Sequence, residues 1–258
     1  MLPPAFKLQL ALLTAIPLAA QTDQLTLSSP DGQIQFRLSI SLPKEDYALL
    51  RPGYEIAYRG QPVLDTSYLG LQIREQDPIL GENTGLIGRK SGVSPPGAPG
   101  EAGYNWLLAQ YMQNGSLGRR LDVEVRAYND GVAFRYLVPR TSPVEELLIE
   151  EEATQFHFPA AAKVSAADTG SGEIKLPFVA EIPGAAWIEI TEVRVPHYPP
   201  MGLQRLGPSR LESALPENGI DPDVAVAGAT PLTGPWRVIL IAPDGAHLRE
   251  APLLGSLK

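Results

Sequence analysis

Residues 121–138 read LDVEVRAYNDGVAFRYLV, and this stretch decides the fold class. Apolar and polar residues alternate from Leu121 to Tyr128, which is the period of a half-buried β-strand. The residues that follow, Asn129-Asp130-Gly131, are typical of a tight turn, and apolar residues resume at Val132. The pattern predicts a β-hairpin in which Asp130 shapes the turn.

Strand patterns recur on both sides of this hairpin. They occupy residues 33–40, 54–58, 69–73, 106–112 and 187–191, and residues 236–242 (WRVILIA) form the most apolar run, typical of a central strand. Gly- and Pro-rich residues 78–103 predict a long surface loop, residues 160–176 and 204–235 predict irregular structure, and residues 246–258 predict a short helix or linker. The sequence therefore predicts an all-β fold over residues 21–258, either a sandwich or a closed barrel, in one domain or in two subdomains.

Composition excludes several classes of function. The chain has no cysteine, which excludes disulfides, thiolate metal sites and cysteine nucleophiles. A net charge of −8 disfavours binding to nucleic acid or to anionic lipid, and no run of the sequence after residue 20 is apolar and long enough to span a membrane.

The first twenty residues predict export. Lys7 precedes the apolar stretch 8–20 (LQLALLTAIPLAA), which ends in small residues. This arrangement is typical of a cleavable signal peptide, so residues 1–20 predict a secreted or periplasmic protein.

Glu192 is the most suggestive acidic residue. It comes at the end of the strand predicted for residues 187–191, before the turn-rich segment 196–201, where a carboxylate can face a cleft and bind a hard cation. By contrast, Glu145, Glu146 and residues 150–152 (EEE) are expected to be solvated charges along a strand edge. His157, His197 and His247 show no metal-binding spacing, and His157 is expected on the opposite face of its strand from the neighbouring phenylalanines.

A series of segments resembles the N-terminal domain of glycoside hydrolase family 97. The resemblance covers nearly all of residues 22–250, and the segments that carry it are 29–32 (SPDG), 58–64 (YRGQPVL), 67–71 (SYLGL), 126–136 (RAYNDGVAFRY), 152–156 (EATQF), 190–193 (ITEV), 198–203 (YPPMGL) and 235–239 (PWRVI).

The resemblance implies a β-super-sandwich of the galactose-mutarotase-like class. In that family the domain packs on a catalytic (β/α)8 barrel, acts with it on α-glucosides or α-galactosides, and lends it a glutamate that binds calcium. The matching position here is Glu192. The resemblance thus implies a non-catalytic domain that works with a barrel in cis or in trans, because the chain reaches Lys258 about where the barrel would begin. Residues 165–170 (SAADTG) depart from the family, which usually has a tyrosine- and glutamate-bearing loop here, so a contribution to substrate binding is in doubt.

Two other functions stay open on the residues alone. A stand-alone carbohydrate-binding module would use exposed aromatic residues to stack on an α-linked oligosaccharide, and Tyr104, Trp106 and Tyr111 are candidates, although Trp106 and Tyr111 also fit the core of a strand. An independent enzyme would need a histidine and a carboxylate in one cleft, for which His157 or His197 could act with Glu192.

Overall fold

The structure is a computed structural model of the 258-residue chain. It describes residues 24–44, 48–97, 100–116, 118–144, 146–164, 172–219, 221 and 223–257. The signal peptide predicted for residues 1–20 and the segment 165–170 lie outside the described residues.

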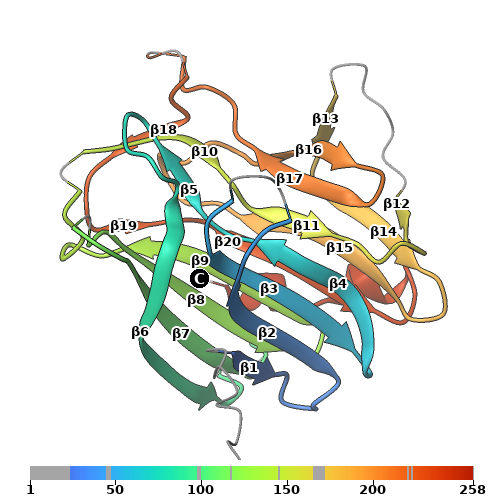
Figure 1. Cartoon of the computed structure of the whole chain (residues 1–258). Coiled ribbons are helices and arrows are strands. Elements are labelled where there is room, and N and C mark those ends of the chain that lie inside the picture. Colours follow the sequence, from blue (N-terminus) through green and yellow to red (C-terminus); the bar gives the residue numbers. More distant parts are fainter. Residues whose placement is uncertain are drawn as a thin grey trace, which may run out of the picture.

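Within these described residues two antiparallel sheets are stacked face to face (Figure 1). The smaller, eight-stranded sheet runs in the order β1 (Leu25–Ser28), β2 (Ile34–Ser41), β3 (Arg51–Tyr58), β4 (Gln61–Tyr68), β11 (Gln155–His157), β17 (Arg210–Ala214), β16 (Gly202–Gly207) and β13 (Glu173–Lys175).

The larger, twelve-stranded sheet runs in the order β12 (Lys163–Val164), β14 (Phe178–Ile182), β15 (Ala186–Val193), β20 (Trp236–Ala242), β9 (Gly131–Val138), β8 (Arg120–Tyr128), β7 (Tyr104–Gln113), β6 (Leu80–Ser94), β5 (Leu71–Ile73), β10 (Leu147–Glu152) and β18 (Val226–Gly228), while β19 (Leu232–Thr233) pairs with β9. The predicted all-β super-sandwich is therefore confirmed.

The main core fills the space between the sheets. Alternate residues of each strand point inward, and aromatic rings join the two layers. Tyr54 of β3 stacks on Phe36 at a centroid distance of 5.4 Å and meets Phe134 of β9 at 5.2 Å. Phe36 and Tyr54 belong to the smaller sheet, so of these two contacts the one between Tyr54 and Phe134 joins the layers, and all three rings are buried.

The hairpin predicted from residues 121–138 is β8 and β9. Tyr128 pairs with Gly131, so Asn129 and Asp130 form the turn, as predicted. The Asp130 carboxylate accepts a hydrogen bond from the Leu253 amide at 2.9 Å, which ties the turn to the C-terminal segment.

The C-terminal segment covers the outer face of the larger sheet. It consists of the 3₁₀ helix η1 (His247–Glu250) and the helix α1 (Leu253–Ser256), so of the helix or linker predicted there the structure has the helix. Leu248, Leu253 and Leu257 are buried in a second apolar cluster with Trp236 and Leu240 of β20. The central strand predicted at residues 236–242 is thus buried on both faces.

The loop predicted over residues 78–103 is wrong for most of its length. Leu80–Ser94 form the fifteen-residue strand β6, which pairs with β7. The glycine and proline content predicted a loop, but a glycine in this strand can instead accommodate a large side chain of the neighbouring strand β7. At Gly92, for example, a Cβ atom would lie 2.9 Å from the indole of Trp106. Residues 204–235 are also more regular than predicted, since β16 and β17 form a hairpin there.

The described residues contain no helix that is long and apolar enough to cross a membrane.

Candidate functional site

Glu192 lies near the end of β15, which continues to Val193 rather than ending at residue 191 as predicted. The pleat turns its side chain toward Arg237 of β20, and the two side chains form an ion pair of 2.6 Å. The backbone amide of Met201 donates hydrogen bonds to both carboxylate oxygens, at 3.2 and 3.3 Å. The Glu192 side chain is 9% exposed, whereas that of its partner Arg237 is 1% exposed.

Arg237 also binds Glu152, which comes from the end of β10. The Nε and Nη2 atoms of Arg237 donate to the two carboxylate oxygens of Glu152 at 2.8 and 2.5 Å. Both side chains are almost fully buried, at 1% and 0% exposed. Burial by itself lowers the pKa of Arg237, but the charge and hydrogen bonds of Glu152, together with Tyr198 and Glu192, outweigh burial, so that the pKa is raised and the guanidinium stays charged.

Glu152 therefore corrects a prediction. It was expected among the solvated charges of a strand edge, but it is buried because Arg237 neutralises it in a two-pronged geometry. The sequence did contain a signal: Arg237 is the single charge in the apolar run 236–242, and a charge in a central strand requires a buried partner.

Hydroxyl groups complete the set of contacts around Glu152. Tyr198 donates to one carboxylate oxygen and Thr154 to the other, both at 2.9 Å. Burial raises the pKa of Tyr198, and the Glu152 charge raises it further, so the phenol remains a proton donor. We call Glu152, Arg237, Glu192 and Tyr198 the buried ion network. It carries one net negative charge, since two carboxylates share one guanidinium.

Comparison with known proteins identifies the family to which this chain belongs. The family described as Glycosyl-hydrolase 97 N-terminal matches residues 27–171. The chain belongs to this family.

Known proteins that are similar to this chain are longer than it. A retaining alpha-galactosidase of Bacteroides thetaiotaomicron is 28% identical over 174 residues, which are 64% of this chain and 23% of that protein. A Glycoside Hydrolase Family 97 enzyme from Pseudoalteromonas sp. strain K8, solved with acarbose, superposes with a TM-score of 0.70 at 21% identity over 85% of this chain and 36% of that chain. A beta-arabinopyranosidase superposes with a TM-score of 0.65 at 22% identity over 85% of this chain and 40% of that chain. The chain thus spans about a third of these solved structures.

Of the two carboxylates in the buried ion network, only that of Glu192 belongs to a side chain that is not fully buried. No group of three or more His, Cys, Asp or Glu side chains in the described parts of the chain is arranged to hold a metal ion. The Glu192 carboxylate could supply at most two of the six to eight oxygen ligands that calcium takes.

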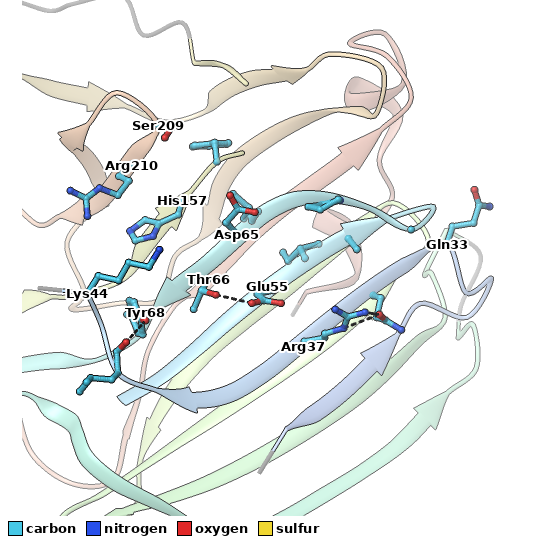
Figure 2. A pocket seen from close by; sticks show the side chains of 18 of the residues that line it. Gln33, Arg37, Lys44, Glu55, Asp65, Thr66, Tyr68, His157, Ser209 and Arg210 are labelled. Atoms are coloured by element: carbon cyan, nitrogen blue, oxygen red, sulfur yellow. Dashed lines mark hydrogen bonds between the residues drawn. The ribbon is translucent and has the colours of Figure 1, made fainter. Parts of the chain in front are cut away.

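The independent-enzyme hypothesis names two histidines, of which His157 lies in a different sheet from Glu192 and His197 lies in a loop. His157 is on the outer face of the smaller sheet, opposite the buried Phe156 and Phe158 as predicted, and it lines a hollow there (Figure 2). Glu192 belongs to the larger sheet. His197 is exposed in the loop that follows β15.

The aromatic residues of the carbohydrate-module hypothesis are largely packed. Tyr111 is 1% exposed and belongs to the core. Tyr104 lies 5.0 Å from Tyr128 and beneath the Arg126 guanidinium, and Trp106 lies over Gly92. These three residues therefore form no common stacking surface for a sugar.

Proposed function

We propose that this chain is a non-catalytic N-terminal domain of a calcium-dependent, exported α-glycosidase. In this role it packs against a (β/α)8 barrel and supplies Glu192 as one calcium ligand. The family match over residues 27–171 carries the proposal, together with the longer enzymes that share the fold over about a third of their length. Export to the periplasm or the exterior is proposed from residues 1–20 alone.

The geometry of Glu192 supports the ligand role. Arg237 and the Met201 amide fix the carboxylate in one orientation, so little side-chain entropy is lost when a cation binds. Arg237 is itself held by Glu152 on two nitrogens, and it therefore neutralises Glu192 only in part. When bound, calcium would orient hydroxyl or carboxylate oxygens of the substrate and of the barrel.

Cation binding by the purified chain tests the ligand role. Terbium, which replaces calcium in oxygen sites, is titrated while its luminescence is excited through nearby tyrosines, with Tyr198 as the expected sensitiser. We expect weak binding that calcium competes away and that Glu192→Gln abolishes. The matched control is Glu181→Gln, which removes a carboxylate paired with Lys163 at 3.0 Å in another part of the larger sheet. Equal terbium binding by the Glu192→Gln and wild-type chains would refute the assignment.

Turnover assays test the non-catalytic role. With calcium present, we expect the chain alone to release no nitrophenol from nitrophenyl α-glucoside or α-galactoside, because the acid and base of a glycosidase must flank the scissile bond. Turnover that persists through purification of the chain would show that it carries its own catalytic pair, and would overturn this part of the proposal.

A further inference from the structure

A second candidate site lies on the outer face of the smaller sheet. There the structure has a hollow of about 790 Å³ over β2, β3, β4 and β11, which the turn between β16 and β17 flanks. We call it the outer hollow (Figure 2). Its volume falls within the range of about 300–1,000 Å³ that is usual for small-molecule sites. It belongs to a different sheet from Glu192 and shares no residue with the buried ion network.

A β-bulge assembles the polar groups of the outer hollow. The pairing of β3 with β4 shifts between Tyr54 and Ile56, so that Asp65 and Thr66 together stand opposite Glu55. Thr66 donates a hydrogen bond of 2.7 Å to one Glu55 oxygen. Bulges re-aim side chains, and this one turns both Asp65 and Thr66 toward the hollow, as Figure 2 shows.

His157 extends this polar row onto a third strand. It pairs directly with Asp65 across β4 and β11, and its ring meets Tyr68 edge-on at a centroid distance of 6.4 Å. Desolvation in the hollow raises the pKa of Asp65, the Glu55 carboxylate raises it further, and His157 and Lys44 act in the opposite direction. Glu55, Asp65 and His157 are therefore close enough to contact one ligand together.

The charges around the outer hollow nearly balance. Arg37, Lys44 and Arg210 face two carboxylates, although the whole chain carries a net charge of −8. Apolar contacts are also available, because Leu42, which lines the hollow, is 58% exposed. Interleaved donors and acceptors of balanced charge, with some apolar surface, suit a ligand that has many hydroxyl groups and no charge of its own.

We propose that the outer hollow binds a short neutral oligosaccharide. Glu55 and Asp65 accept hydrogen bonds from sugar hydroxyls, and Arg37 and Arg210 donate to hydroxyl oxygens. Leu42 contacts the C–H surface of a ring. The site does not depend on calcium or on a barrel, so the two proposals stand or fall separately.

Calorimetry on the full chain tests the proposal with maltotriose, cellotriose and raffinose as neutral probes and trigalacturonate as the acidic one. We expect at least one neutral sugar to bind and the acidic sugar to bind more weakly. Asp65→Asn and Glu55→Gln should each lower the affinity about tenfold or more, because each replaces a charged acceptor. The matched control Glu217→Gln alters an exposed carboxylate on a loop outside the hollow and should leave the affinity unchanged.

Two further readouts locate the ligand. On titration with the sugar, the imidazole NMR signals of His157 should shift while those of His247, which binds Asp244, stay fixed. Glu192→Gln should leave sugar binding intact, and the hollow variants should leave terbium binding intact. The proposal is wrong if none of the three neutral sugars binds, if trigalacturonate binds more tightly than all of them, or if binding survives in both hollow variants.

Discussion

Replacing Arg237 with methionine would remove the one positive charge from the buried ion network. Methionine fills a similar volume, so the change mainly leaves Glu152 without its counter-ion at a position that is 0% exposed. Thr154 and Tyr198 still donate to the carboxylate, but neither carries a compensating charge. Breaking a buried pair in this way costs about 3–5 kcal/mol, which for a domain of this size is a fall in Tm of roughly 6–20 °C.

The measurement is urea unfolding followed by tryptophan fluorescence, with Trp236 next to the substitution as the main reporter. The midpoint should fall while the m-value stays constant. Acidification should reduce the loss of stability in the variant, because an unpaired buried carboxylate has a raised pKa and its protonated form favours folding as the pH falls.

The double variant Glu152→Gln/Arg237→Met should be more stable than Arg237→Met alone. Arg249→Met, at an exposed position, should change stability by less than about 0.5 kcal/mol. A loss below about 1 kcal/mol for Arg237→Met, or a double variant no better than the single one, would refute the reasoning.

Three other substitutions test the packing of the sandwich. Gly92→Ala should cost about 1–3 kcal/mol and shift the emission of Trp106, because the new Cβ would lie 2.9 Å from the indole; unchanged thermal unfolding would contradict this close contact. Leu253→Ala should cost about 2–5 kcal/mol and expose Trp236 to water, seen as a red-shifted emission, since Leu253 is 0% exposed; an unshifted spectrum would mean that the C-terminal segment does not cover β20. Burial raises the pKa of Asp130, so its contribution to stability is present at low pH and is lost as the pH rises through the folded pKa. Asp130→Asn should therefore gain stability relative to the wild type as the pH rises above about 3.9, and a difference that is flat with pH would count against a buried carboxyl there.

Local patterns sufficed to predict much of the sandwich. The hairpin of β8 and β9 could be predicted because its alternation and its turn residues lie within eighteen consecutive residues. Strand β6 was missed because Gly88 and Gly92 read as loop residues, whereas their role depends on Gln110 and Trp106 of the partner strand. Without knowledge of which strands pair, the sequence does not distinguish a glycine that accommodates a large side chain of the next strand from a glycine in a turn.

The candidate site depends on contacts between distant residues. Glu192 was singled out because of its place at a strand end, but its partner Arg237 is 45 residues away, and Glu152 is 85 residues from Arg237. Glu152 looked like its neighbours Glu150 and Glu151, and only the fold distinguishes it from them. The outer hollow was not predicted for a similar reason, since a bulge and a pairing between β4 and β11 bring its groups together.

The packing of the C-terminal segment against the larger sheet affects how a second domain could be attached after it. Leu253 is tied through its amide to Asp130, and Leu257 is buried against the larger sheet. A module fused directly after Leu257 would therefore be joined to a packed segment of this domain rather than to a flexible linker. The position of α1 on the sandwich would then limit the orientation of the added module and set its effective concentration near this domain. A flexible glycine–serine linker inserted between the two would loosen the orientation and lower the effective concentration.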